Sequence, residues 1–317
     1  MVSVTERNKP RNNAGARTAL RTLLRQRQLM LMSVPMLLYV LLFNYAPLWG
    51  WITAFMDYKP SRALFDNPWV GFANFEWLFH QPEFYLAIRN TMAMSAINLV
   101  FGTASSIVLA LFLNEIRFTP FKRTVQTVTY LPHFLSWVIV VGLAQSMFAT
   151  DGVVNHALMA LHVIQKPAFW LGEGRYFWWL VGVINVWKEV GWNSIIYLAA
   201  IASIDPTLYE AASIDGAGRF RKMISVTLPG VRATFFVLLI MNIGHLMEAG
   251  FEIQYLMGQN LLVDWSQTID IYVLKYGITQ GRYARATAAG IFKSVVSIVL
   301  LYGANRIAKR MDETTLM

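Results

Sequence analysis

Long apolar stretches separated by short charged segments dominate this chain. Six of them are long enough to cross the hydrocarbon core of a bilayer, which takes roughly 20 apolar residues. They cover approximately residues 29–55, 91–113, 124–149, 176–200, 233–253 and 286–305. The alternating ten-residue segments of a membrane β-barrel are absent, so each stretch is expected to be a helix. The pattern predicts an all-α integral membrane protein with six transmembrane helices.

The composition supports this interpretation. Of the 317 residues, 56% are hydrophobic and only 14% are charged, which is too little charge for the surface of a soluble protein of this size. The chain has no cysteine, which excludes disulfides, thiol chemistry and Cys-ligated zinc. Its five histidines are scattered without metal-ligand spacing, so we expect no metal site and no catalytic centre.

The charges between the spans predict the topology. Basic residues are concentrated before the first span, between spans two and three, between spans four and five, and after span six. By the positive-inside rule, these segments lie in the cytoplasm together with both termini. The predicted organisation is a basic arm (1–28), a six-span domain (29–310) containing a cytoplasmic loop (205–229), and a short tail (311–317). A nucleic-acid-binding arm is the alternative for residues 1–28, but directly before a span such charges more often set orientation, and no nucleic-acid partner is expected.

The loop between spans four and five has a distinctive pattern. Asp205-Pro206 breaks the chain and residues 207–212 resume as a helix, with Asp205 or Thr207 as its cap and Pro206 in its first turn. Gly216 permits a sharp turn that a side chain would obstruct. Residues 219–226 then predict a short amphipathic helix on the membrane surface, which Pro229 ends before span five.

This string of residues resembles a family signature. Glu210, Ala211 and Ala212, then Asp215, Gly216 and Ala217, and finally Leu228 and Pro229 match the motif of the membrane subunits of binding-protein-dependent ABC importers. Met223 and Ala233 depart from the usual aromatic and second proline, which affects only local packing. In that family the loop is a coupling helix seated in a groove of an ATPase subunit. The resemblance assigns this role to Tyr209, Glu210, Ala211, Ala212, Ser213, Asp215, Gly216, Ala217 and Gly218.

The resemblance extends from the arginine-rich arm to the end of the chain and favours the carbohydrate branch. The segment 130–136, with sequence Tyr-Leu-Pro-His-Phe-Leu-Ser, is similar to the oligosaccharide subgroup, including bacterial alginate importer permeases. It implies a type I importer fold in the bacterial cytoplasmic (inner) membrane. The implied partners are a second, different permease chain, two ATPase subunits, an extracytoplasmic solute-binding protein and a sugar or oligosaccharide substrate.

The energy source is expected on another chain. A phosphate-cradling loop needs a Gly-Lys pair followed by Ser or Thr, and no Gly-Lys pair occurs in this sequence. We therefore expect no cofactor in this chain and Mg-ATP on the separate ATPase.

Polar residues inside the spans predict the solute path, because such side chains normally face a cavity or a partner. In span five, Asn242, His245, Glu248 and Glu252 recur at three- and four-residue steps and are expected to share one helical face. Amides, carboxylates and flat rings suit a sugar path. The candidate path residues are Asn185, Trp187, Asn193, Asn242, His245 and Glu248. The alternative is structural: Lys188 could simply neutralise Glu189 or Glu248.

Two other functions compete with the permease. The charged residues within the spans could serve an ion-coupled secondary transporter, but no internal inverted repeat is visible and such a protein has no use for the loop at Glu210. An intramembrane enzyme is the third class, but no nucleophile–base spacing supports it.

Overall fold

The computed structural model describes residues 26–258 and 262–310. The chain divides into two compact units, Met1–Ile52 and Thr53–Met317, which are described separately here. Residues 1–25 of the predicted basic arm and the predicted tail 311–317 lie outside the described residues.

The described residues are almost entirely helical, and their only β-bridge pairs Met56 with Trp69. The principal segments in chain order are α2 (Arg27–Val40), η1 (Leu41–Tyr45), η2 (Ala46–Phe55), η3 (Leu64–Asp66), α3 (Ala73–Phe79), α4 (Pro82–Ile97), η4 (Asn98–Gly102), α5 (Thr103–Glu115), α6 (Thr119–Tyr130), η5 (Leu131–Phe134), α7 (Trp137–Met147), α8 (Val153–Ala160), α9 (Gly174–Ala202), α10 (Pro206–Ile214), α11 (Arg219–Lys222), η6 (Met223–Thr227), α12 (Leu228–Gly230), α13 (Arg232–Gly244), α14 (Glu252–Met257), α15 (Val263–Ser266), α16 (Ile269–Leu274), η8 (Lys275–Thr279) and α17 (Tyr283–Arg310).

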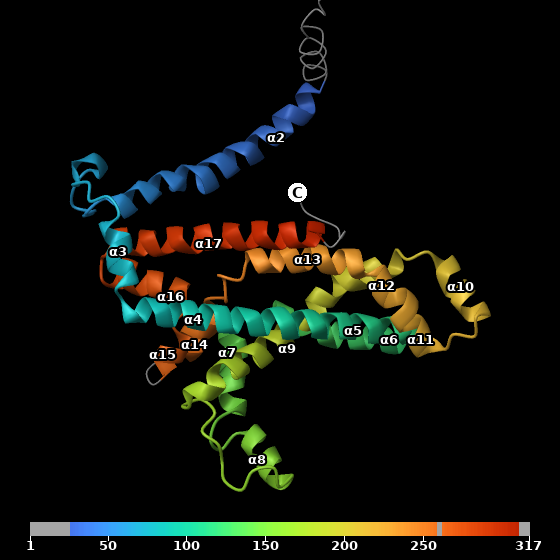
Figure 1. The fold of residues 1–317 in the computed structure, drawn as a ribbon. Helices are drawn as coiled ribbons and strands as arrows, with labels where there is room; N and C mark the ends of the chain where they lie inside the picture. Colours follow the sequence, from blue (N-terminus) through green and yellow to red (C-terminus); the bar gives the residue numbers. More distant parts are fainter. Residues whose placement is uncertain (1–25, 259–261, 311–317) are drawn as a thin grey trace, which may run out of the picture. The chain divides into compact units, whose positions relative to one another are not determined.

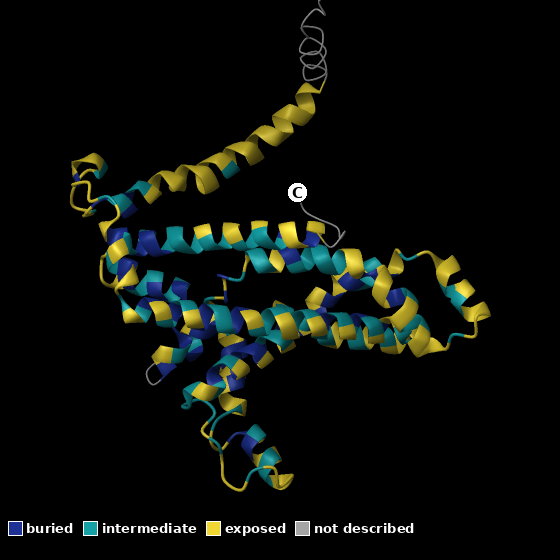
Figure 2. Cartoon of the chain, viewed as in Figure 1, coloured by how far each residue is buried: buried dark blue, intermediate teal, exposed yellow. Residues whose placement is uncertain are grey.

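The first unit contains α2, η1 and the beginning of η2. These segments belong to one helical stretch, Arg27–Phe55, which is long and apolar enough to cross a membrane. None of the residues in its most hydrophobic window is buried, and α2 is exposed along nearly all of its length (Figure 2). An apolar helix of this kind needs lipid or another protein chain around it.

The second unit is built on two extensive helix contacts. α4, η4 and α5 form one continuous helix, Pro82–Glu115, and α5 packs along α9, while α13 packs along α17 (Figure 1). One core cluster contains Met94, Val140 and Val181, contributed by α4, α7 and α9. Another contains Phe84 and Tyr272, contributed by α4 and α16.

Three helices of the described chain are long and apolar enough to cross a membrane, and up to six spans result if each of three bent helix pairs counts as one. The predicted first, second and sixth spans correspond to the single helices Arg27–Phe55, Pro82–Glu115 and Tyr283–Arg310. The predicted fourth span lies within α9, which has 29 residues. The all-α architecture agrees with the sequence prediction.

The prediction of one continuous helix for span three is wrong. The helix tightens into a 3-10 turn at Leu131–Phe134 and breaks at Leu135–Ser136, after which α7 departs at 104°. Pro132 has no backbone N–H and restricts the residue before it, which disfavours a continuous α-helix here. Ser136 then starts α7 afresh, because its side chain accepts a hydrogen bond from the Ile139 backbone N–H.

The prediction for span five is also wrong in part. α13 ends at Gly244, and the chain passes through a non-helical turn before α14 begins at Glu252. Gly250 in this turn has φ +91°, which a side chain would disfavour. Glu248 and Glu252 therefore cannot lie on one helical face with Asn242.

The short helix predicted for residues 219–226 is longer than expected. It continues as Arg219–Gly230, with Pro229 inside it, and α13 then departs at 55°. Pro229 is tolerated because a π-helical turn, η6, precedes it and changes the local hydrogen-bond pattern.

Candidate functional site

α10 is the short helix that the sequence motif predicts, and it follows α9 after a bend of 71°. Asp205 caps its first turn, where Oδ1 accepts a hydrogen bond of 2.9 Å from the Thr207 backbone N–H. This hydrogen bond holds the pKa of Asp205 below its usual value. Pro206 occupies the first turn, where a missing N–H costs nothing. Of the two caps that the sequence allowed, the structure uses Asp205.

A tight turn returns the chain from α10 towards the membrane helices. Gly216 adopts φ +74° in this turn, in the left-handed region that glycine occupies at little cost. Two contacts tie α10 to the following helix: the Tyr209 hydroxyl lies 3.0 Å from Thr227 Oγ1, and Lys222 Nζ donates a 2.6 Å hydrogen bond to Ser213 Oγ. α10 is thus held by its neighbours at one side only.

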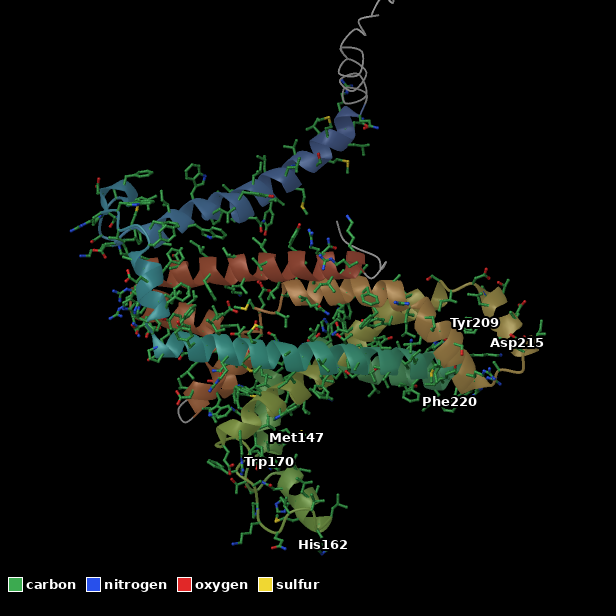
Figure 3. All side chains as sticks on the ribbon, viewed as in Figure 1. Met147, His162, Trp170, Tyr209, Asp215 and Phe220 are labelled. Carbon is green, nitrogen blue, oxygen red and sulfur yellow. The ribbon has the colours of Figure 1, made fainter. Side chains whose placement is uncertain are left out.

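The segment also exposes large apolar side chains. Ile214 is 87% exposed and Phe220 is 74% exposed, and Leu208 is also exposed. The labelled residues Tyr209, Asp215 and Phe220 lie together in Figure 3, on a different lobe from Met147, Trp170 and His162. Of the nine predicted coupling residues, Tyr209, Glu210, Ala211, Ala212 and Ser213 lie on α10, and Asp215, Gly216, Ala217 and Gly218 form the turn. An ATPase contact for them stays a prediction.

A polar cavity of about 360 Å³ lies among the helices of the second unit. Its volume falls in the range of about 300–1,000 Å³ usual for ligand sites. Its walls come from the helix α4–η4–α5, from α9, and from the end of α13 with the turn that follows. The lining residues with polar side chains are Ser95, Asn98, Thr103, Asn185, Glu189, Asn193, Tyr197, Asn242, His245 and Glu248.

Five of the six predicted path residues meet at this cavity. They are Asn185, Asn193, Asn242, His245 and Glu248. Trp187 is not among the lining residues and is 47% exposed. The residues predicted from span five meet at one cavity for a reason other than the predicted one, and their role in a solute path stays a prediction. The end of α13 brings Asn242 and His245 to the cavity, and the turn, rather than a helical face, brings Glu248.

The polar side chains that line the cavity are arranged by α9 and by the end of α13. Asn185, Glu189 and Asn193 stand four residues apart on α9 and therefore form one row. At the end of α13, His245 Nδ1 lies 2.8 Å from the Met241 carbonyl oxygen. Because a carbonyl oxygen can only accept, Nδ1 is the donor in this contact, and Nε2 lies at the other side of the ring. Glu248 Oε1 lies 3.9 Å from Lys293 Nζ, and about half of its side chain is exposed.

Sequence reasoning missed the contribution of span two to the cavity. Ser95, Asn98 and Thr103 line it from the helix α4–η4–α5, where η4 is a π-helical turn of the kind often found at functional sites. Ser95 Oγ and Asn98 Oδ1 are buried without a hydrogen-bond partner in the described structure. The signal was available, because an amide within an apolar span is costly without a role.

The structural alternative for Lys188 holds. Lys188 Nζ lies 3.1 Å from Glu189 Oε1 and donates a 2.7 Å hydrogen bond to the His133 carbonyl. Glu248 pairs instead with Lys293, which also contacts Asp270 at 2.7 Å. No group of three or more His, Asp or Glu side chains suited to a metal ion occurs in residues 26–258 and 262–310.

Comparison with known proteins identifies the family. Residues 102–313 match the binding-protein-dependent transport system inner membrane components. Protein LplB of Bacillus subtilis is 44% identical over 290 residues, covering 91% of each chain. The polygalacturonan/rhamnogalacturonan transport system permease protein YteP of the same organism is 43% identical, covering 92% of this chain and 90% of that one.

Solved structures agree. A chain of a bacterial ABC transporter involved in the import of the acidic polysaccharide alginate matches with a TM-score of 0.83 and 38% identity, covering 92% of this chain and 99% of that one. A second structure, of a bacterial alginate ABC transporter in complex with an alginate pentasaccharide-bound periplasmic protein, gives a TM-score of 0.84 and 37% identity, covering 93% and 99%.

The chain belongs to the family of binding-protein-dependent transport system inner membrane components. It is therefore a permease subunit of an ABC importer, and ATP hydrolysis takes place on a separate subunit. This result confirms the resemblance drawn from residues 210–229 and leaves the ion-coupled alternative without support.

Proposed function

We propose that this chain forms half of the path by which an ATP-driven importer carries an oligosaccharide across the bacterial inner membrane. It pairs with a second, different permease chain, receives solute from an extracytoplasmic binding protein, and sits on two ATPase subunits. The observation that carries the proposal is the continuity of α9. The middle of this helix lines the polar cavity with Asn185 and Asn193, and its C-terminal end leads through a single bend into α10.

The mechanism follows from this connection. α10 is seated in a groove of an ATPase subunit, and the exposed side chains of Leu208, Ile214 and Phe220 supply its apolar contact. Closure of the ATPases around ATP displaces α10, and α9 passes the displacement to the cavity wall. The permease pair then alternates between inward-facing and outward-facing states, because ATP biases a two-state bundle. Both termini lie in the cytoplasm in this arrangement, as does α10.

The solute is an oligosaccharide released from a polysaccharide. The cavity offers amides, carboxylates and hydroxyls that can bond sugar hydroxyl groups. Two relatives carry acidic polysaccharides or their fragments according to their names, which makes uronate-containing oligosaccharides, including alginate fragments, the first candidates.

Co-purification with the ATPase subunit tests the coupling role. Glu210→Ala and Gly216→Ala are expected to leave the complex assembled but to reduce ATP hydrolysis stimulated by the solute-loaded binding protein. Gly216→Asn is expected to be milder, since asparagine adopts a positive φ more readily than alanine. Asp66→Ala, in a distant 3-10 turn, is the control. Normal stimulation in both α10-segment variants would contradict the proposal.

A further inference from the structure

The break between α6 and α7 is fastened to the middle of α9 by a compact set of contacts. Lys188 Nζ donates to the His133 carbonyl at 2.7 Å, and His133 Nδ1 lies 2.7 Å from Glu189 Oε2. Glu189 Oε1 in turn lies 3.1 Å from Lys188 Nζ. These three residues close a ring of contacts between two helical segments that are 55 positions apart in sequence.

Burial makes this ring energetically demanding. The Lys188 side chain is only 6% exposed, so its ammonium group has lost nearly all of its water. A buried cation must be compensated by a counter-charge and by hydrogen bonds. Glu189 supplies the charge, the His133 carbonyl supplies an acceptor, and the face of Trp137 lies 5.0 Å from Nζ. If the break moved away from α9, Lys188 would keep Glu189 but would lose the His133 carbonyl and the Trp137 face, which together complete its buried environment.

His133 is held on its flat side as well. Its ring stacks on the indole of Trp192 with the ring centroids 4.4 Å apart and an angle of 3° between the planes. Gly191, which directly precedes Trp192, lets the backbone of α6 approach α9 closely, because a Cβ at this position would lie 2.0 Å from the Thr129 carbonyl oxygen. Contact of helices at small residues is typical of packing inside membranes.

Glu189 connects this ring to both ends of the proposed mechanism. Its carboxylate borders the polar cavity in the row between Asn185 and Asn193. From Glu189, α9 continues for 13 more residues to Ala202 and then bends into α10. A straight helix of that length spans about 20 Å. The ring therefore lies at the cavity wall, on the same helix that leads to α10.

We propose that Lys188, Glu189 and His133 are positioning residues that clamp the α6–α7 break to α9, so that α6, α7 and α9 move as one body when α10 is displaced. The inference rests on the proposed function, because it needs α10 to transmit the movement. It assigns a role to the Pro132-His133 segment that the sequence motif alone does not explain: this segment holds α6 and α7 to the helix that lines the cavity.

Spin labels in the complete transporter test the clamp. The chain has no cysteine, so Val138→Cys on α7 and Val183→Cys on α9, both exposed positions, accept labels without background. Pulsed electron–electron double resonance then measures the α7–α9 distance in the nucleotide-free and the ATP-trapped complex. With the clamp intact, the distance is expected to be the same in both states.

His133→Phe is the informative variant. It keeps a ring to stack on Trp192 but removes the Nδ1 contact with Glu189. The α7–α9 distance is expected to differ between the two states in this variant, and solute transported per ATP is expected to fall by about threefold to tenfold, the range for the net loss of one ordinary hydrogen bond. His133→Asn, whose side-chain amide replaces the Nδ1 donor, is expected to restore much of the ratio of solute transported to ATP hydrolysed. Glu173→Gln, which removes an exposed ion pair with Arg175 on the same helix, is the control.

If the His133→Phe complex does not assemble, the double variant Lys188→Met with Glu189→Gln tests the clamp instead. It removes both charges together, so that no ion is left buried alone. The α7–α9 distance is expected to differ between the two states in this variant as well. A distance and a transport ratio unchanged in these variants overturn the clamp, as does an α7–α9 distance that already changes in the parent complex. If the solute-loaded binding protein does not stimulate ATP hydrolysis in the parent complex, the proposed function is contradicted. The α7–α9 distances in the nucleotide-free and ATP-trapped states would still test the clamp.

Discussion

At the scale of single residues, the cavity depends on where one helix ends. α13 stops at Gly244, and the His245 backbone N–H then bonds to the carbonyls of the last turn. This ending turns the His245 ring and the Glu248 carboxylate towards the cavity that Asn242 also borders. A continued helix would have carried Glu248 further along the α13 axis. The local backbone, more than the identity of these residues, decides that they meet.

His245→Ala and Glu248→Ala are each expected to weaken solute uptake and to leave the complex assembled. Loss of one hydrogen bond to solute corresponds to about a tenfold rise in the KM of transport where the bond involves a charged group. Uptake of labelled oligosaccharide into proteoliposomes measures this effect. His156→Ala, an exposed histidine on α8, is the matched control. Transport that is unchanged in both variants would remove these residues from the path.

At the scale of elements, the breaks in helices were harder to predict than the helices. Apolar length located the three single helices that are long enough to cross a membrane, because a span needs about 20 apolar residues. The break after the 3-10 turn at Leu131–Phe134 was not predicted, and its angle of 104° depends on the docking of residues 131–136 against α9. The turn after Gly244 was not predicted either, because Asn242, His245 and Glu248 keep a helical spacing across it. Breaks set by partners on another helix leave little signal in their own segment.

Gly191→Ala is expected to destabilise the packing of α6 on α9. The new Cβ would lie 2.0 Å from the Thr129 carbonyl oxygen, and backbone must move to relieve that contact. Such overpacking costs about 1–3 kcal/mol. Gly142→Ala on α7 is the matched control, because no atom lies within 4 Å of its Cβ position. Thermal unfolding of the purified complex measures both variants, and equal midpoints would show that the α6–α9 contact yields without cost.

At the scale of the whole molecule, topology joins the two proposed ends of the mechanism. The positive-inside rule predicts that the loop 205–229 lies in the cytoplasm and that the lobe around α8 lies on the outer side. The lobe is internally well ordered, since buried Asn155 bonds the backbone at Ala149, Thr150 and Ala168. Solute would then enter on the side of α8 and the ATPase would act on the side of α10.

Cysteine labelling checks this topology. Leu161→Cys and Ile214→Cys introduce single thiols at positions that are 72% and 87% exposed, in a chain without any other cysteine. In intact spheroplasts, a membrane-impermeant maleimide is expected to label residue 161 but not residue 214, which should react only after the membrane is disrupted. The cysteine-free parent protein reports any background. The reverse pattern would invert the predicted topology.

The sequence by itself determined the class of the protein, the number of apolar stretches and the motif at residues 210–229. These properties are local, since apolar length follows from bilayer thickness and the motif is contiguous. The tertiary structure alone decided that Ser95 and Asn98 share a cavity with His245, that Lys188 pairs with Glu189, and that His133 rests on Trp192. Those pairings join residues on different helices or choose among several possible partners. Only packing in three dimensions selects which polar groups meet inside a bundle, because every such group must find some partner there.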